Sequence, residues 1–140
     1  MAHPTDPTAV FQEMMEKDYC SQWMGIEPVL LETGHCIIKM TVKKEMLNGF
    51  GILHGGIAFA FADSAFAFAA NGLGLMTVSI NAQINYHQPA KEGEILLAEA
   101  IEVASSKKMV TMDVSIRREK DKTQIASFRG MGYRLSLIHI

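Results

Sequence analysis

One stretch limits the folds open to this chain more than any other: residues 48–71, with the sequence NGFGILHGGIAFAFADSAFAFAAN. A glycine-rich loop leads into residues 57–70, where only Asp63 and Ser64 are polar. Because alanine is the best helix former, this run of alanine and phenylalanine predicts a helix rather than a strand. Its apolar residues are not confined to one stripe, so we expect burial on most sides. It is too short to span a membrane, which takes roughly 20 apolar residues.

Asp63 is the most unusual residue of this helix. Aspartate is a mediocre helix former, and its capping ability is useful only at a helix end. Carboxylates are rarely buried unless they are paired or hydrogen-bonded, because removing the charge from water is costly. Asp63 therefore pairs with an arginine or lysine, lies on a polar seam, or has a chemical function, and we favour the function.

Composition and charge narrow the class of protein. The 140 residues form one domain, 1–140, long enough for a sizeable core. The net charge of −2 argues against a nucleic-acid-binding protein, which carries a basic excess. The first ten residues, MAHPTDPTAV, lack the basic and apolar regions of a secretory signal. Cys20 and Cys36 do not have the spacing of a metal or redox motif. We therefore expect a cytoplasmic protein without a membrane segment or a metal site.

Upstream of the central helix, the pattern predicts an N-terminal helical segment over residues 1–24. Its helix, 7–19, is capped by Asp6 and begins with Pro7, a residue suited to the first turn. The next segments are predicted as two short strands and a loop, over residues 25–31, 35–42 and 43–53.

Downstream of the central helix, the chain is strand-like to its end. Residues 77–87 alternate in polarity, which predicts that five apolar side chains share one face of a strand: Val78, Ile80, Ala82, Ile84 and Tyr86. Three further strands are predicted over residues 94–103, 109–117 and 123–135. The apolar tail, 135–140, either extends the last strand or is not native to the protein.

These elements predict an α+β fold in which an antiparallel sheet packs against one long helix. A single sheet covers one side of that helix, whereas a helix that is apolar all round needs a second cover. A second copy of the protein is the simplest cover. We therefore expect a homodimer or a larger homo-oligomer.

Several motifs together carry a resemblance to a known family. An Asn-Gly pair at Asn48, His-Gly-Gly at 54–56, an alanine-rich helix with Asp63 and a Tyr-x-x-Pro-Ala turn at 86–90 follow one another along the chain. This pattern, over residues 47–135, resembles the hotdog-fold acyl-CoA thioesterases of the phenylacetate-degradation (PaaI-like) type. The resemblance implies a six-stranded antiparallel sheet wrapped around the central helix, with an extra N-terminal helix. It also implies a homodimer that pairs into a dimer of dimers.

Thioester hydrolysis needs groups that polarise a carbonyl, hold the oxyanion and deliver water or a nucleophile. A helix N-terminus supplies unpaired N–H groups and a positive dipole end, and Gly55 and Gly56 let a substrate approach this backbone closely. The resemblance implies that the Gly55 N–H is the oxyanion donor and that Asp63 is the general base or the nucleophile. Asp63 lies about 12 Å further along the helix, so the Asp63 of a second copy would complete each site.

The resemblance also implies supporting roles for other residues. Asn48 donates to the thioester carbonyl or positions the water, although Asn-Gly is also a common turn pair. His54 bonds the thioester or only braces the loop, and Ser79 orients water or faces solvent. The acyl pocket is expected along the helix at Gly56, Phe59 and Phe66, although phenylalanines at helical spacing are normally core.

Coenzyme A is part of the expected substrate, and no further cofactor is implied. Its phosphates need cations and backbone donors, and lysines are suitable point charges, although basic residues at turns are usually only solvated. In the family two turns cradle the coenzyme, and here they correspond to Tyr86, His87, Gln88, Pro89, Ala90 and Lys91, and to Ser105, Ser106, Lys107 and Lys108.

Two alternatives to a thioesterase stay open. The first is a hydratase or dehydratase of the same fold, which uses a catalytic histidine and an acid in a different loop-helix pattern. The second is a non-catalytic acyl-CoA-binding sensor, which gains nothing from an acid within an apolar helix. The set of Asn48, Gly55 and Asp63 therefore favours the thioesterase.

Overall fold

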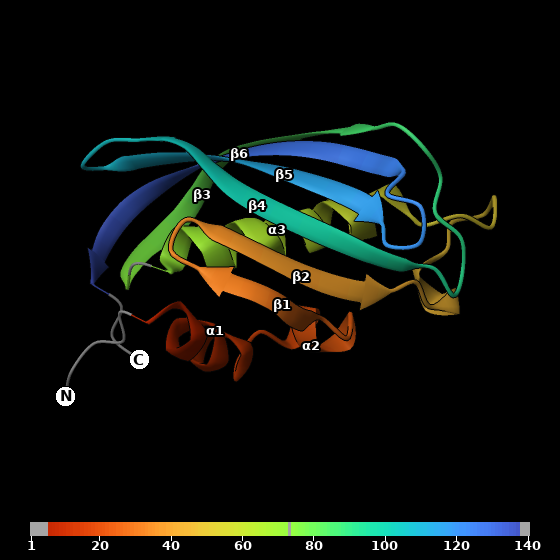
Figure 1. Cartoon of the computed structure of the whole chain (residues 1–140), viewed down its shortest axis with the longest axis horizontal. Helices are drawn as coiled ribbons and strands as arrows, with labels where there is room; N and C mark the ends of the chain where they lie inside the picture. The colour runs from red at the N-terminus through yellow and green to blue at the C-terminus, as the bar shows by residue number, and fades with distance from the viewer. Residues whose placement is uncertain (1–5, 73, 138–140) are drawn as a thin grey trace.

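The computed structural model describes residues 6–72 and 74–137. Within them, six strands form one antiparallel sheet that curves around the long helix α3 (Figure 1). The strands are β1 (Glu27–Glu32), β2 (His35–Thr41), β3 (Leu75–Tyr86), β4 (Ile95–Ser105), β5 (Met109–Arg118) and β6 (Gln124–Leu137). The helices are α1 (Pro7–Met15), α2 (Tyr19–Trp23) and α3 (Gly55–Asn71), with a 3₁₀ turn η1 (Lys44–Met46). The order across the sheet is β1-β2-β4-β5-β6-β3, which confirms the predicted α+β architecture.

The central helix begins two residues earlier than predicted. His54 is the N-cap of α3, so Gly55 and Gly56 form its first turn instead of preceding it. The helix packs against the inner face of the sheet, where alternate residues of the strands are buried, as in β2 and β5. The largest fully buried side chains of α3 are Phe61 and Phe66. The apolar run of the sequence thus becomes the centre of the core, as expected.

The N-terminal segment forms two helices instead of the single helix predicted over residues 7–19. Asp6 caps α1 as predicted, but Asp18, which lies inside the predicted helix, caps α2 by accepting the N–H of Ser21 at 3.0 Å. Aspartate is a much better residue for a cap than for a helix interior, and the chain ends α1 before it.

Helices α1 and α2 supply part of the second cover that we expected only from another copy of the chain. The rings of Phe11 in α1 and Phe68 in α3 meet edge to face at 4.6 Å between centroids. The hydroxyls of Ser21 in α2 and Ser64 in α3 lie 2.8 Å apart. The expectation was incomplete because the apolar stripe of α1 in the sequence does not indicate which surface this helix packs against. A second copy of the chain is needed to cover only the part of α3 that α1 and α2 leave exposed.

Strand β3 has a β-bulge that the alternation of the sequence did not reveal. The register with β6 shifts between Ser79 and Asn81, so one extra residue interrupts the pairing. As a result Val78 pairs with Tyr133 whereas Ala82 pairs with Gly130. Successive residues of a strand point to opposite faces, so Tyr133 and Gly130 lie on opposite faces of β6, and so do their partners Val78 and Ala82. The prediction that Val78 shares a face with the later apolar residues of β3 is therefore wrong, and Ile80 lies at the bulge without a partner in β6.

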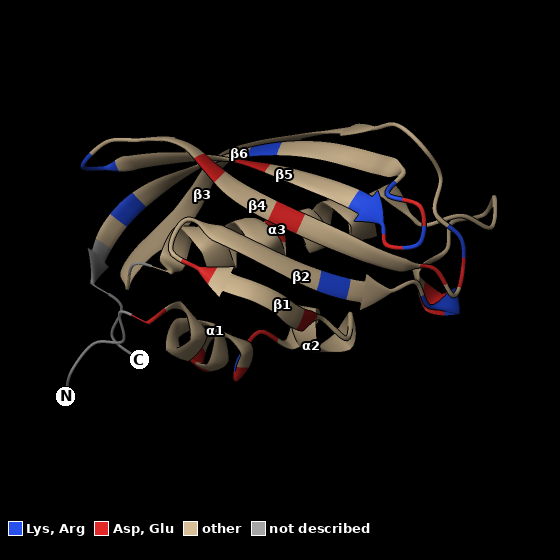
Figure 2. Ribbon diagram, viewed as in Figure 1, with Lys and Arg blue, Asp and Glu red and all other residues tan. Residues whose placement is uncertain are grey.

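Charged residues of both signs are interspersed along the strands and turns (Figure 2). No helix of the described residues is long and apolar enough to cross a membrane. Strand β6 runs to Leu137, and residues 138–140 of the predicted tail lie outside the described residues.

Two glycines of β6 make room for the ring of Phe66. A Cβ atom at Gly130 would lie 2.8 Å from Cδ2 of Phe66 and 2.9 Å from Cε1 of Phe128. A Cβ atom at Gly132 would lie 2.6 Å from Cγ2 of Thr77 and 3.1 Å from Cζ of Phe66. Because the rings are buried, they have little space in which to move.

We predict that Gly130→Ala lowers the free energy of unfolding by about 1–3 kcal/mol, the usual cost of overpacking a core. Gly49→Ala is the matched control, since a Cβ atom there meets no atom within 4 Å. Urea denaturation of both variants measures the difference. Equal stability of the two variants would contradict this account of the core.

Candidate active site

The loop before α3 is held by the side chain of Asn48. Its Oδ1 accepts the N–H of Phe50 at 2.9 Å and that of Ile52 at 3.3 Å. Gly51 has φ of +77°, a conformation that glycine adopts without strain. Among the described residues, Nδ2 of Asn48 has no acceptor, and Asn48 lines a pocket. The turn role and the donor role therefore use different atoms of one side chain and are compatible.

The first turn of α3 leaves one backbone donor without an acceptor among the described residues. The N–H of Gly56 donates to Nδ1 of His54 at 2.9 Å, and the N–H groups of Ile57 and Ala58 donate to the His54 carbonyl. The N–H of Gly55 has no such partner. Because Nδ1 of His54 accepts a hydrogen bond, the ring proton of neutral His54 is on Nε2. The geometry thus gives His54 a bracing role and leaves the Gly55 N–H available.

The end of β3 is locked to this helix start. The hydroxyl of Tyr86 donates to the carbonyl of Gly55 at 2.7 Å. A Cβ atom at Gly55 would lie 3.0 Å from both Cζ and the hydroxyl oxygen of Tyr86, so any larger residue would displace the ring. Gly55 is therefore required by packing as well as by access to its N–H.

A pocket of about 410 Å³ opens at this junction. Its lining is more apolar than polar and comes from the loop, the start of α3 and the turn after β3. The lining residues are Asn48, Ile52, Leu53, Gly55, Ala58, Tyr86, His87, Gln88, Pro89, Ala90 and Ile125. The structure thus brings together most of the residues predicted in the 48–56 and 86–91 motifs. The apolar residues that line the pocket were not predicted from the sequence, because nothing in their local sequence distinguishes them from core residues.

Asp63 is absent from this pocket but has the environment of a functional acid. It is half-buried, and among the described residues it makes no ion pair or hydrogen bond. Burial, and secondarily the negative charge of Asp18, raise the pKa of Asp63 above the ordinary value of 3.8. The cation partner that we weighed against a function is not found among these residues, whereas polar contacts of α3 are present beside Asp63, where Ser64 bonds to Ser21.

Asp63 lies on the one stripe of α3 that the rest of the chain leaves incompletely covered. Gly56, Ala60, Asp63 and Ala67 recur at helical spacing, and none of the four is fully buried. The other three are small, so the backbone of α3 can be approached closely along this stripe. The acid therefore lies on a surface suited to contact with a second molecule.

The other predicted substrate residues do not gather in the pocket. Phe66 is 2% exposed and belongs to the core. Phe59 is half-buried, with its ring edge to face against Phe128 at 5.4 Å between centroids. Ser79 is exposed on β3, paired with Gly132 on the side of the sheet that faces α3. Gly56 is exposed on the stripe that carries Asp63.

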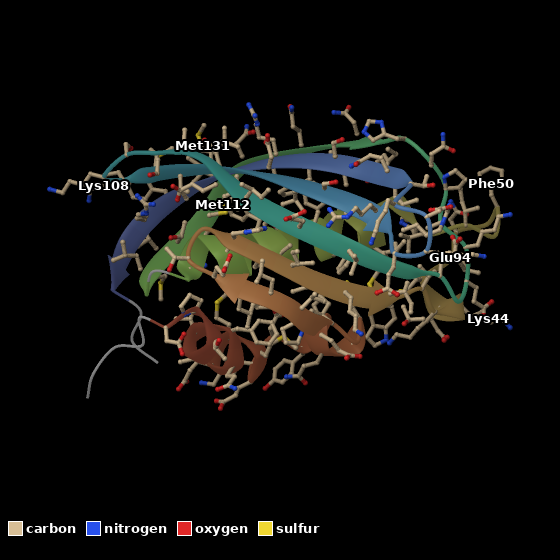
Figure 3. The ribbon with its side chains drawn as sticks, in the orientation of Figure 1. Lys44, Phe50, Glu94, Lys108, Met112 and Met131 are labelled. Carbon is tan, nitrogen blue, oxygen red and sulfur yellow. The ribbon has the colours of Figure 1, made fainter. Side chains whose placement is uncertain are left out.

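The two turns predicted to bind coenzyme A lie at opposite ends of the sheet. Residues 86–91 precede β4 and residues 105–108 begin at its last residue, and a strand of eleven residues is about 34 Å long. Figure 3 shows Phe50, from the loop that contributes to the pocket, at one end and Lys108 at the other. Lys108 lies over the ring of Tyr133 at 5.8 Å, and Lys91 and Lys107 are exposed. One copy of the chain does not bring the two turns together.

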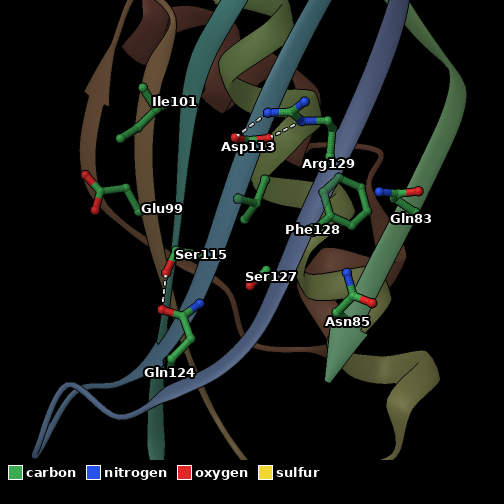
Figure 4. A pocket seen from close by; sticks show the side chains of 11 residues that line it. Gln83, Asn85, Glu99, Ile101, Asp113, Ser115, Gln124, Ser127, Phe128 and Arg129 are labelled. Atoms are coloured by element: carbon green, nitrogen blue, oxygen red, sulfur yellow. Dashed lines mark hydrogen bonds and ion pairs between the residues drawn. The ribbon is translucent and has the colours of Figure 1, made fainter. Parts of the chain in front are cut away.

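A second depression, of about 420 Å³, lies on the outer face of the sheet (Figure 4). Two pairs of its polar side chains bond to each other: Arg129 forms two hydrogen bonds with Asp113, and Ser115 donates to Gln124 at 2.9 Å. None of the predicted site residues lines it. Among the described residues, no three His, Cys, Asp or Glu side chains gather as metal ligands do.

Comparison with known proteins places the chain in a family. The profile of the Thioesterase superfamily matches residues 50–125, more than half of the chain. The acyl-coenzyme A thioesterase PaaI of Escherichia coli K12 is 36% identical over 122 residues, which are 87% of this chain and 86% of that protein. The human acyl-coenzyme A thioesterase 13 is 31% identical over 98 residues, which are 69% of this chain and 70% of that protein.

Solved structures agree with the sequence comparisons. The structure of the E. coli PaaI protein from the phenylacetic acid degradation operon has a TM-score of 0.92 and 31% identity, over 99% of this chain and all of that chain. The TT0310 protein of Thermus thermophilus has a TM-score of 0.80 and 32% identity, over 85% of this chain and 99% of that chain. The predicted hotdog fold and PaaI-like resemblance are confirmed, and this chain belongs to the thioesterase superfamily.

Proposed function

We propose that this protein hydrolyses an acyl-CoA thioester to the free acid and coenzyme A, at sites shared between two copies of the chain. One observation carries the proposal. Among residues 6–72 and 74–137, the two pocket donors Gly55 N–H and Nδ2 of Asn48 have no acceptor, whereas Asp63, which has no cation partner there, lies outside the pocket. Within one chain, Gly55 and Asp63 are separated by about 12 Å of helix, so a single copy has an incomplete site.

The edge of the sheet supports pairing of two copies through β3. Strand β3 is twelve residues long and lies at the edge of the sheet. Three large apolar side chains along it are 39–53% exposed: Met76, Val78 and Ile80. A long apolar edge strand is a ready surface for pairing with another chain. The small-residue stripe of α3 around Asp63 is the neighbouring open surface.

Antiparallel pairing of two β3 strands would also unite the two coenzyme-binding turns. Register places the start of β3, the end of β6 and the start of β5 at the same end of the sheet. A twofold axis across β3 brings that end of one copy beside the opposite end of the other. The 105–108 turn of one copy then lies at the same end of the paired sheets as the 86–91 turn of its partner. Lys91, Lys107 and Lys108 would supply cations for the phosphates of coenzyme A.

The chemistry follows from these groups. The Gly55 N–H and Asn48 Nδ2 of one copy donate to the thioester oxygen and stabilise the negative charge that develops on it. Asp63 of the other copy takes a proton from water as the water oxygen adds to the carbonyl carbon. Collapse of the tetrahedral intermediate expels the coenzyme A thiolate, which takes up a proton. In the alternative route the Asp63 carboxylate itself adds to the carbon and expels the coenzyme A thiolate, which takes up a proton, and water then hydrolyses the resulting anhydride to the free acid and the Asp63 carboxylate.

The hydratase and sensor alternatives are less well supported. A hydratase uses a catalytic histidine and an acid in a different loop-helix pattern, whereas here Nδ1 of His54 caps the same helix that carries Asp63. A sensor has no use for a carboxylate that is desolvated without a partner. Release of free thiol from a panel of acyl-CoA esters, read with a thiol reagent, distinguishes the three functions. Tight binding without release would indicate the sensor, and change at an acyl double bond the hydratase.

We predict that Asp63→Asn reduces kcat on the best acyl-CoA ester at least about 100-fold, because the amide can neither accept a proton nor attack carbon. Binding of the ester, measured by calorimetry, should be largely retained. Near-normal kcat in this variant would contradict the role of Asp63.

The same variant should be more stable than the wild type at neutral pH. The pKa of Asp63 is raised on folding, so ionisation of this carboxyl opposes folding. The protonated carboxyl makes its full contribution to stability below the pKa of the unfolded chain. That contribution is lost as pH rises through the pKa of the folded protein. Asp113→Asn is the control of opposite sign, since a hydrogen bond from Arg129 lowers the pKa of Asp113. Thermal unfolding at pH 7 should give a higher Tm for the first variant and a lower Tm for the second.

We predict that Asn48→Asp lowers kcat roughly 100-fold, the usual cost of removing one oxyanion donor. Aspartate keeps the oxygen that accepts from Phe50 and Ile52 and replaces the donor nitrogen with a negatively charged acceptor oxygen. An unchanged Tm confirms that the loop is intact. Full activity with an unchanged Tm would mean that Asn48 is a turn residue only.

A further inference from the structure

A chain of hydrogen bonds connects the N-terminal segment to the helix of Asp63. The hydroxyl of Ser21 donates to Oδ2 of Asp18 at 2.7 Å, and the N–H of Ser21 donates to Oδ1 of the same carboxylate at 3.0 Å. The hydroxyl oxygens of Ser21 and Ser64 lie 2.8 Å apart. A serine hydroxyl has one hydrogen, and that of Ser21 is used on Asp18, so Ser64 is the donor to Ser21. The order of donation is therefore Ser64 to Ser21 to Asp18.

This chain is a polar link across an otherwise apolar contact. Ser21 is fully buried, which is unusual for a serine unless its hydroxyl is bonded. Hydrogen bonds that end on a carboxylate are stronger than neutral ones. The link fixes Ser64, and Ser64 is the neighbour of Asp63 along the helix. The position of Asp63 along its stripe is thus coupled to Asp18.

Asp18 also acts on Asp63 through its charge. Among the described residues neither carboxylate takes part in an ion pair, and no cation is among the causes that act on Asp63. After burial, the charge of Asp18 is the further cause of the raised pKa of Asp63. A general base is most effective when its pKa is close to the working pH, so a raised pKa strengthens an aspartate as a base.

Other titratable groups around α3 do not have this effect. From the sheet, the helix is faced by the thiol of Cys36 in β2 and the phenol of Tyr86 in β3, and α1 carries Glu13. Arg134, near the end of β6, donates to the carbonyl of Ser106. The remaining charged groups of the central strands stand on the opposite face of the sheet: His35, Lys39, Glu99, Asp113, Arg117 and Arg129. None of these groups contributes to the shift at Asp63.

We propose that Asp18 is a positioning residue of the active site: it holds Ser64, the neighbour of Asp63, through Ser21, and its negative charge acts on Asp63. The inference rests on the proposed hydrolase function and adds to it a group from the N-terminal segment. Asp18 touches no substrate in this account and acts only through Asp63.

The test is the pH profile of kcat for Asp18→Asn. Asparagine is as good an N-cap as aspartate, so α2 is retained while the charge is removed. Activity requires ionised Asp63 and is lost as pH falls through its pKa. Removal of the Asp18 charge lowers that pKa, so the acidic limb of the profile should move to lower pH. Asp18→Ser, a second neutral cap, should move the limb in the same direction.

Asp6→Asn is the matched control, because it makes the same change at the cap of α1 and Asp6 does not act on Asp63. Its profile should superimpose on that of the wild type. A carbon-13 NMR titration of the Asp63 carboxyl in wild type and Asp18→Asn gives the same comparison without substrate. An unmoved titration, a limb at higher pH, or an equal shift in Asp6→Asn would overturn the inference. Failure of the proposed function would instead appear as a wild-type protein that releases no thiol.

Discussion

A single desolvated carboxylate is the constraint on which this structure depends. Helix α3 is the core of the fold, and Asp63 is placed in it without a cation or a hydrogen bond from any described residue. Such a group opposes folding at neutral pH, so stability alone would not retain it. The same desolvation strengthens it as a base. The helix therefore combines two roles that conflict energetically, and its buried phenylalanines supply the stability that the acid removes.

The elements whose signals are local could be predicted from the sequence. The alanine-rich run, the cap at Asp6 and the alternation of the later strands each depend on neighbouring residues, and the helices and strands appear close to the expected positions. The features that failed depend on partners far along the chain. The bulge after Ser79 is defined only by pairing with β6, and the cover from α1 only by its contact with Phe68. The break at Asp18 was ambiguous because one residue type suits both a cap and a tolerated interior position.

The candidate site was predictable as a motif but not as a shape. The family resemblance implied that Asn48, Gly55 and Asp63 belong to one site, and helix geometry already separated the last two by about 12 Å. It could not reveal that Asn48 uses its oxygen for the loop and keeps its nitrogen available. Nor could it reveal that Phe66 is core, because the space for its ring is made by glycines of β6. Long-range packing decides both points.

The central claim is that each site takes its acid from one copy of the chain and its donors from the other. Mixing two inactive variants, Asp63→Asn and Asn48→Asp, by refolding them together tests it most directly. If sites are shared, a mixed dimer contains one intact site, and the mixture recovers about one quarter of the wild-type activity, since half of the dimers are mixed. If one copy supplied both groups, every site in the mixture would carry a substitution, and no recovery of thiol release would contradict the account.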